Sequence, residues 1–240
     1  MNKVIKCCRV GKSNQNRNYE CQDYGIVINE EDFICGILAD GAGSKKNSLA
    51  GAKMVVNATR RVLQNTMEKE LGLQEIKKEI IVSCMQQYPT NKEEKHEMAS
   101  TLLFYAVYKN RAIWGNIGDG IIIGCCGKQT TIIADAENGE YVNQTYFMTD
   151  DNVERHLRMG EETVIEQEAR TVFLMTDGIA KKFYNPRSQK ISEVCEQISS
   201  WGEKYSQEEI QNAMTENIEE QFIYLVKDDI GIEILYLGGE

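Results

Sequence analysis

Aspartates at the ends of predicted strands are the residues of this chain whose types and spacing could support chemistry. The sequence has 10 Asp among its 37 acidic residues, and three of them precede Gly: Asp40-Gly41, Asp119-Gly120 and Asp177-Gly178. With 19 Gly in 240 residues, fewer than one such pair is expected by chance. Asp-Gly is also the commonest hairpin turn, so any one of these pairs, taken alone, could be only a turn.

Two of the pairs follow runs that are apolar enough to be buried strands, namely FICGILAD and TVFLMTD. A carboxylate at the mouth of a buried strand must be solvated, paired or bound to metal, because isolated burial costs several kcal/mol. Basic residues are few beside these aspartates; they are Lys181, Lys182 and Lys227. Carboxylates that converge with so few basic partners require a cation, and ligation by oxygen alone favours Mg²⁺ or Mn²⁺ over Zn²⁺.

Short β-rich runs predict the strands that would position these carboxylates. Asp23 opens the run 23–28, and an acidic turn leads back into the run 33–39. A hairpin of these two strands would place Asp23 beside Asp40. Further strands are predicted at 100–108, 111–117, 121–125, 128–134, 141–148, 163–166, 171–176 and 230–237. Two-residue connections such as Lys109-Asn110 favour antiparallel pairing.

Apolar residues at helical spacing predict the helices that would cover these strands. The first begins near Asn47 or Ser48 and runs to Met67, and the second covers 73–88 and ends before Pro89. Two more are predicted at 188–201 and 208–225. Residues 1–22 are polar and are basic up to Arg17, and the segment NKEEKHE is interpreted as a polar loop. Because strands and helices are grouped and do not alternate, the pattern predicts an α+β fold in one domain, residues 1–240.

The composition excludes several classes of partner. A net charge of −10 and a pI near 4.9 argue against a surface for nucleic acid or an anionic membrane. The eight cysteines have no zinc-ligand spacing and are interpreted as free thiols, which predicts a cytoplasmic protein. His96 and His156 are interpreted as surface residues. The sequence has no P-loop, dinucleotide-binding glycine motif or nucleophile elbow.

An ordered set of motifs resembles the metal-dependent protein phosphatase 2C (PP2C, or PPM) family in its compact bacterial form. The segment CQD at 21–23 resembles its first acidic motif, and ADGAGS at 39–44 resembles its Asp-Gly motif. The remaining motifs follow in the family's order: ASTLLFYAV at 99–107, NIGDG at 116–120, LMTDG at 174–178 and KDDIGIEIL at 227–235. Each motif alone is moderately specific, but together they span almost the whole chain.

The resemblance implies a four-layer α-β-β-α sandwich of two antiparallel sheets with two Mn²⁺ or Mg²⁺ ions in a cleft. Asp40 would bridge both ions, Asp23 and the Gly41 carbonyl would serve one, and Asp177 and Asp228 the other. Asp40 and Asp177 would thereby be catalytic. A hydroxide between the ions would attack phosphoserine or phosphothreonine in a protein substrate. The partners implied are a phosphorylated protein and an opposing Ser/Thr kinase, and the chain is expected to be a monomer.

Three positions depart from the family pattern. Where the family has a phosphate-holding arginine this chain has Asn18, so Arg17 or Lys12 is expected to bind phosphate instead. Ala42 occupies the position of a histidine in eukaryotic members. Asp119 matches a ligand of a third, weaker ion, but Lys181 replaces another aspartate of that site. This replacement argues against a third ion and makes Lys181 a candidate contact for substrate phosphate.

These departures leave two alternatives open. One is a non-catalytic domain that binds metal and a phosphorylated partner, and the other is a phosphoesterase that acts on a small molecule or nucleotide.

Overall fold

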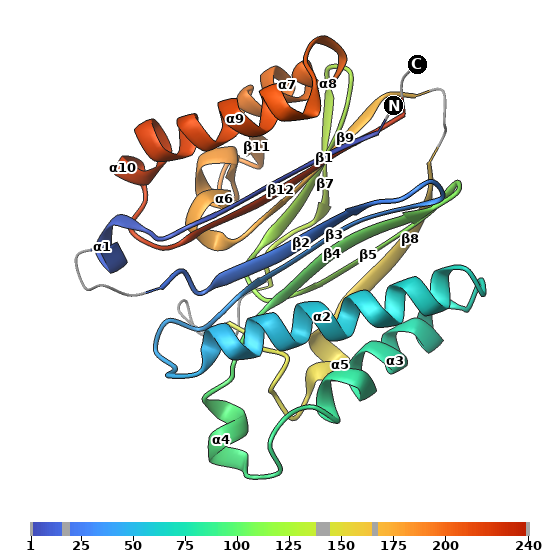
Figure 1. Ribbon diagram of the computed structural model, residues 1–240, viewed down its shortest axis with the longest axis vertical. Helices are drawn as coiled ribbons and strands as arrows, with labels where there is room; N and C mark the ends of the chain where they lie inside the picture. Colours follow the sequence, from blue (N-terminus) through green and yellow to red (C-terminus); the bar gives the residue numbers. More distant parts are fainter. Residues whose placement is uncertain (1, 16–19, 138–144, 165–167, 239–240) are drawn as a thin grey trace.

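The computed structural model describes residues 2–15, 20–137, 145–164 and 168–238. Two five-stranded antiparallel sheets face each other, and helices cover the outer side of each sheet (Figure 1). The predicted α+β sandwich is therefore confirmed. None of the helices in the described ranges combines the length and apolarity that a membrane crossing requires.

The first sheet has the strand order β2-β3-β4-β5-β8. Its strands are β2 (Asp23–Asn29), β3 (Phe33–Asp40), β4 (Leu102–Tyr108), β5 (Arg111–Ile117) and β8 (Arg158–Thr163). Two long antiparallel helices, α2 (Ser48–Met67) and α3 (Leu73–Met85), cover its outer face (Figure 1). The side chains of β3 are buried up to Ala39, because a strand between a helical layer and a second sheet is shielded on both faces.

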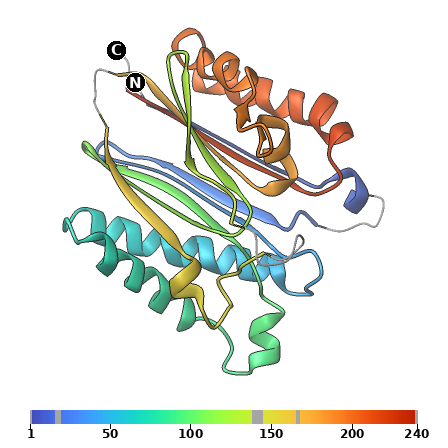
Figure 2. The same ribbon diagram turned by 180° about the vertical axis from the view of Figure 1, so that it is seen from behind.

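The second sheet has the order β1-β12-β9-β6-β7. Its strands are β1 (Lys3–Arg9), β12 (Ile230–Leu237), β9 (Arg170–Met175), β6 (Ile121–Cys126) and β7 (Gln129–Ala134). Its helical layer contains α6 (Asp177–Phe183), α7 (Val194–Ser199), α8 (Trp201–Lys204), α9 (Gln207–Asn217), a π-helical turn (Ile218–Phe222) and α10 (Ile223–Leu225). Figure 2 shows the opposite edge of the sandwich, where β7 and β8 end the two sheets.

Three apolar clusters join the four layers. One lies between α2, α3 and the first sheet, and another between the second sheet and the C-terminal helices. The third lies between the two sheets and includes Leu38, Leu103 and Leu174. Each cluster removes the apolar face of one layer from water, which is the main stabilising contribution in such a stack.

The predicted hairpin of β2 and β3 is confirmed. The two strands pair antiparallel, and their register places Asp23 directly opposite Asp40. The observed bounds of β5 and β12 are those predicted, 111–117 and 230–237. The first long helix begins at Ser48 and ends at Met67, also as predicted.

Several local predictions were wrong. The NKEEKHE segment, predicted as a loop, contains α4 (Lys92–His96), and residues 1–22, for which no element was predicted, contain β1 and the short helix α1 (Lys12–Gln15). Of the strand predicted at 141–148, residues 145–148 form no strand and 141–144 lie outside the described residues. β8 begins at Arg158 and ends at Thr163, where a strand was predicted to begin, and residues 165–166 of that predicted strand lie outside the described residues. The helix predicted from 188 begins only at Val194, after a hairpin of β10 (Tyr184–Asn185) and β11 (Lys190–Ile191). A short helix α5 (Val153–His156) lies before β8.

Candidate metal centre

Five of the predicted site aspartates lie at the same end of the sandwich. Asp23 opens β2 and Asp40 closes β3 in one sheet. In the other, Asp119 precedes β6, Asp177 follows β9 and Asp228 precedes β12. Antiparallel pairing brings strand starts and strand ends together, which explains why residues more than 200 positions apart meet at one edge.

The carboxylate of Asp23 is buried between the two sheets. Its side chain accepts a hydrogen bond of 2.8 Å at Oδ2 from the hydroxyl of Thr176, which follows β9 in the opposite sheet. Its other oxygen, Oδ1, receives no hydrogen bond from a described donor. Burial, reinforced by the nearby charges of Asp229 and Asp177, raises the pKa of Asp23 well above its usual value. A proton or a cation shared with Asp40 would satisfy the bare oxygen.

Asp40 is held by its backbone while its carboxyl stays among other acids. Its amide donates to the Thr101 hydroxyl at 2.9 Å, and the Thr101 amide donates to its carbonyl at 2.8 Å. Burial raises the pKa of the Asp40 carboxyl well above its usual value, and four neighbouring carboxylates add to the shift. In order of effect these are Asp23, Asp177, Asp119 and Asp228. The side chain of Asp40 therefore lies within electrostatic range of the other four carboxylates.

Asp177 and Asp228 are brought together by close packing of two turns. A Cβ added to Gly178 would lie 3.4 Å from the Asp228 Cβ and in severe contact with the Asp229 carbonyl, so glycine is required there. Burial raises the pKa of Asp228, and the charge of Asp177 adds to the shift. Asp177 Oδ2 lies 2.8 Å from Nζ of Lys181, one turn further along α6. That hydrogen bond raises the pKa of Lys181, whose side chain is 73% exposed.

Asp119 occupies the turn between β5 and β6 on the side of Asp177. It accepts a hydrogen bond of 2.7 Å from the Thr145 hydroxyl. Burial, together with the charge of Asp177, raises the pKa of its carboxyl. Asp119 and Asp177 both line a cavity of about 680 Å³, which also reaches Lys181 and the hairpin after α6. The carboxylate centre therefore opens into a groove.

Gly41 makes a backbone approach that another residue would obstruct. It forms an isolated bridge with Ser100, and its amide donates to the Gln22 carbonyl at 3.1 Å. A Cβ at this position would lie 2.8 Å from the backbone of Ser48 at the start of α2. The glycine lets the first helix begin directly beside the carboxylates.

The predicted phosphate-binding residues have different outcomes. Arg17 and Asn18 lie outside the described residues. Lys12, in α1, lies with Nζ 4.6 Å from the centre of the Tyr224 ring. Lys181 is beside the carboxylates, as its ion pair with Asp177 shows.

Three residues that position the centre were missing from the sequence prediction. Thr101 and Thr176 orient Asp40 and Asp23 through hydroxyl hydrogen bonds. Asp229 is buried and accepts hydrogen bonds from the amides of Gly11 and Gln22, at 2.8 and 2.7 Å. It thereby fastens the segment before β2 to the start of β12. Their positions next to the predicted acidic motifs were the available signal.

The centre fits a hard divalent cation. Its side-chain donors are all carboxylate oxygens, one of them buried without a hydrogen-bond donor, and Lys181 is the cation paired with them among the described residues. No three His, Cys, Asp or Glu side chains in the described ranges already enclose one ion position. Mg²⁺ keeps several waters in protein sites and Mn²⁺ also prefers oxygen donors, so ions could bind here through few direct carboxylates.

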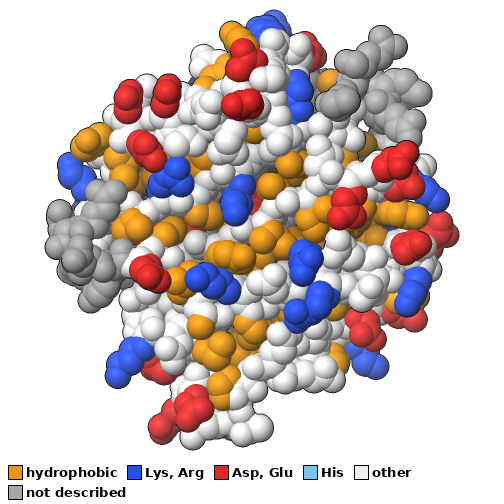
Figure 3. All heavy atoms as spheres, in the orientation of Figure 1, with side chains coloured by type: hydrophobic (Ala, Val, Ile, Leu, Met, Phe, Trp, Pro, Cys, Tyr) orange, Lys and Arg blue, Asp and Glu red, His pale blue; other side chains and the backbone are white. Residues whose placement is uncertain are grey.

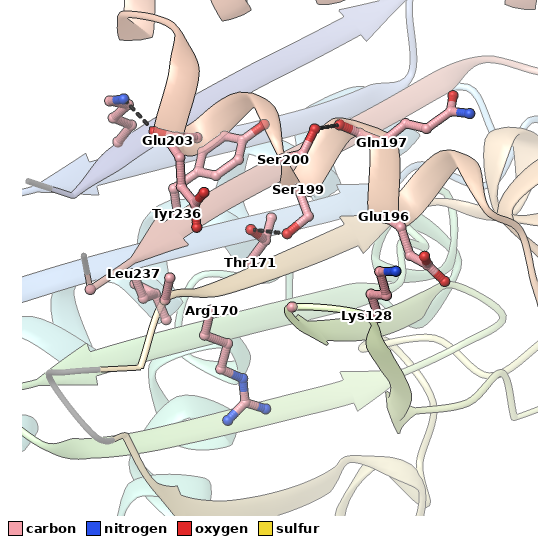
Figure 4. Close-up of a pocket in the computed structure, with 15 residues that line it drawn as sticks. Lys128, Arg170, Thr171, Glu196, Gln197, Ser199, Ser200, Glu203, Tyr236 and Leu237 are labelled. Carbon is pink, nitrogen blue, oxygen red and sulfur yellow. Dashed lines mark hydrogen bonds between the residues drawn. The ribbon is translucent and has the colours of Figure 1, made fainter.

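A second cavity, of about 730 Å³, lies at the other end of the second sheet and touches none of these aspartates (Figure 4). Its hydroxyls bond within the protein: those of Thr171 and Ser199 lie 2.8 Å apart, and that of Ser200 donates to the Gln197 carbonyl. The Tyr236 hydroxyl donates to the carbonyl of Ile198. Among the described residues that line this cavity, Arg170 Nε is the buried side-chain atom without a hydrogen-bond partner, so the lining offers no group of acids like that of the carboxylate centre.

Comparison with known proteins relates this geometry to a family. The family model described as Protein phosphatase 2C matches residues 10–221. The chain is 26% identical over 194 residues to serine/threonine-protein phosphatase 3 of Escherichia coli (strain K12), a match that covers 76% of each chain.

Solved structures share the fold at low sequence identity. The serine/threonine phosphatase Stp1 from Staphylococcus aureus matches with a TM-score of 0.68 at 14% identity, over 100% of this chain and 96% of that one. The catalytic domain of the serine threonine protein phosphatase PstP, in complex with two manganese ions, matches with a TM-score of 0.61 at 13% identity, over 99% of each chain.

Proposed function

The chain belongs to the protein phosphatase 2C family, and from that premise we propose that it is a Mn²⁺- or Mg²⁺-dependent phosphatase of phosphoserine and phosphothreonine in proteins. The observation that carries the proposal is the convergence of Asp23, Asp40, Asp119, Asp177 and Asp228 on one centre. Their mutual repulsion is relieved when divalent ions bind, and the centre opens into a groove that a peptide could enter.

We propose that the ions are held by the residues that match the family's ligand positions. Asp40 would serve both ions, Asp23 and the Gly41 carbonyl would serve one, and Asp177 and Asp228 the other. Asp119 would hold a third ion only weakly, because Lys181 supplies a positive charge beside Asp177. When bound, such ions polarise phosphoryl oxygens and lower the pKa of water bound to them, so that hydroxide is available at neutral pH.

The protein's own groups would orient the substrate. Thr101 and Thr176 hold Asp40 and Asp23 in place, so the carboxylates need little rearrangement when a phosphate arrives. The exposed ammonium of Lys181 can turn from Asp177 toward a phosphoryl oxygen once ions neutralise that carboxylate. Arg17 is the other candidate phosphate ligand.

The eight free cysteines fit a reducing cytoplasm, where we place the protein.

Hydrolysis of p-nitrophenyl phosphate and of a phosphoserine peptide by the purified chain tests this proposal. Activity should require Mn²⁺ or Mg²⁺ and fall by about 100-fold or more in Asp40→Asn and Asp177→Asn, since each change removes several kcal/mol of charge stabilisation. Asp32→Asn is the matched control, because Asp32 lies in the exposed turn at the other end of the β2–β3 hairpin.

Two results would contradict the proposal. Equal activity in Asp40→Asn and in the wild type would show that catalysis does not depend on the carboxylate centre. Tight binding of the phosphopeptide without phosphate release at any Mn²⁺ concentration would instead indicate a binding domain.

A further inference from the structure

The segment between the centre and α7 is strongly basic in an otherwise acidic protein. Residues 178–192 read GIAKKFYNPRSQKIS and carry Lys181, Lys182, Arg187 and Lys190 with no acidic residue, while the whole chain has a net charge of −10. In the structure this segment comprises α6 and the hairpin of β10 and β11, both on the second sheet's helical side (Figure 1).

This basic hairpin is firmly attached to the core. Phe183 is fully buried, and its ring stacks on Phe222 with centroids 5.8 Å apart. The Ser192 amide donates to the Phe183 carbonyl at 2.8 Å and closes the base of the hairpin. At the tip, Asn185 Oδ1 accepts from the amides of Arg187 and Ser188 at 3.0 and 3.3 Å. The backbone therefore holds Arg187 in a defined position, while its side chain is exposed.

Arg187 lines the same groove as the carboxylate centre. The lining of the cavity of about 680 Å³ includes Asp119, Asp177 and Lys181 as well as Pro186 and Arg187. Ile121 and Ala180 supply apolar surface within it. Lys190 instead lines a neighbouring hollow with Lys182. Among the described residues, no carboxylate lies within ion-pair distance of Arg187 or Lys190, so these charges are available.

We propose that the groove beneath Arg187 binds the peptide that flanks the phosphorylated residue, and that Arg187 selects substrates with an acidic side chain close to that residue. This inference rests on the proposed function, because the phosphate must lie at the carboxylate centre for the flanking peptide to follow the groove. A flanking carboxylate would meet an unpaired guanidinium, which can bind it through two parallel hydrogen bonds. A polyanion such as nucleic acid would extend beyond this segment and be repelled by the net negative charge of the chain.

Binding of non-hydrolysable peptides separates this selectivity from catalysis. Fluorescent peptides with a phosphonate in place of phosphoserine would carry Asp, Asn or Lys at the neighbouring positions, and their Kd would be measured by anisotropy in Mn²⁺. For the wild type we expect the Asp peptide to bind roughly three- to five-fold more tightly than the Asn peptide, as for one exposed ion pair. The Lys peptide should bind more weakly than either, and added salt should reduce the differences.

Variants of the hairpin locate the effect. Arg187→Gln should make the Asp and Asn peptides equal in affinity, whereas Arg187→Lys should restore at least half of the preference. Lys190→Gln removes the same charge from the same hairpin on its other side, so it should leave the preference unchanged. A preference that survives in Arg187→Gln, or that Lys190→Gln abolishes equally, would overturn the assignment, and so would its absence in the wild type.

Phosphatase activity is measured separately on p-nitrophenyl phosphate, which has no flanking peptide. If the wild type shows peptide selectivity but no hydrolysis, the proposed reaction is refuted and the proposed role of the groove in peptide binding stands. If the wild type hydrolyses p-nitrophenyl phosphate but shows no peptide selectivity, the proposed role of the groove is refuted and the proposed reaction stands.

Discussion

At the scale of single residues, the centre depends on carboxylates kept in places where water cannot solvate them fully. Asp23 is 3% exposed, and its Oδ2 is satisfied by a hydroxyl from the opposite sheet. Thr176 also accepts a hydrogen bond from the Gly231 amide at 2.9 Å, so one hydroxyl links the start of β2 to β12. This link couples the two sheets at the point where the ions would bind.

A second buried acid lies deeper between the sheets. Glu233, in β12, is fully buried and occupies space that Gly25 and Gly36 leave open. A Cβ at Gly25 would lie 2.3 Å from Glu233 Oε1 and one at Gly36 would lie 2.8 Å from Oε2, so a larger residue at either position would displace the carboxyl. Burial raises the pKa of Glu233 well above its usual value, and nearby Lys6 offsets only part of the shift. The shift favours the protonated carboxyl in the folded protein.

This raised pKa predicts a pH dependence of stability. Above about pH 4.5 the unfolded chain releases the Glu233 proton while the folded chain keeps it, so the free energy of unfolding falls as pH rises, by about 1.4 kcal/mol per pH unit, until the folded pKa is reached. Urea unfolding between pH 5 and 7 should show this slope in the difference between the wild type and Glu233→Gln. The same difference taken for Glu79→Gln, an exposed site, should stay flat. A flat difference for Glu233→Gln as well would mean that the carboxyl is ionised when folded.

At the scale of elements, the centre depends on how closely α6 approaches the turn before β12. Gly178 in the first turn of α6 faces the Asp229 carbonyl, and Gly11 before α1 faces the carbonyl of Asp228. Asp229 in turn holds the amides of Gly11 and Gln22. The segments around Gly11, Gln22 and Gly178 therefore all contact Asp228 or Asp229, and any displacement of the turn that holds these two residues moves Asp228.

Gly178→Ala should separate these elements. The new Cβ would collide with the Asp229 carbonyl, which belongs to the backbone and cannot rotate away. We expect a loss of about 1–3 kcal/mol in the free energy of urea unfolding, as for other overpacked sites, together with reduced Mn²⁺-dependent activity. Gly43→Ala is a matched control near the centre, because its Cβ would make only ordinary contact, 3.4 Å from Gln22. Equal stabilities for the two variants would contradict this packing.

At the scale of the whole molecule, five carboxylates gather at one end of the sandwich. On the face in Figure 3, acidic and basic side chains alternate without a continuous patch of either sign. The carboxylates of the centre are different because five of them share one edge and Lys181 alone among the described residues pairs with them. Their repulsion opposes folding until a cation binds.

Divalent ions should therefore stabilise the folded chain. At Mn²⁺ concentrations about 100 times the Kd, binding to the folded state contributes about 2.7 kcal/mol, which corresponds to a rise in Tm of about 5–10 °C for a chain of this size. Asp40→Asn should melt at a higher temperature than the wild type in EDTA, because one member of a cluster of mutually repelling carboxylates is removed, yet gain less than half as much from Mn²⁺. Asp32→Asn should follow the wild type in both conditions. A wild-type Tm that does not change when Mn²⁺ is added would exclude the centre as a metal site.

The sequence alone determined the layers of this fold and the acidic positions at strand ends. Apolar runs and short connections set the β2–β3 hairpin, and a two-strand hairpin register is local, so the Asp23–Asp40 pair could be predicted. The long helix from Ser48 to Met67 has a sustained apolar stripe and was equally predictable. The order of the motifs identified the family before any contact was known.

Only the tertiary structure decided what surrounds those positions. β1 has a weak apolar pattern and is a strand because it pairs with β12, more than 220 residues later. The links from Thr176 to Asp23 and from Asp229 to Gly11 join segments remote in sequence, and the space around Glu233 exists only when two sheets pack together. Local patterns record which residues can be buried. Partners across sheets and the resulting pKa shifts depend on packing between segments that no short stretch of sequence contains.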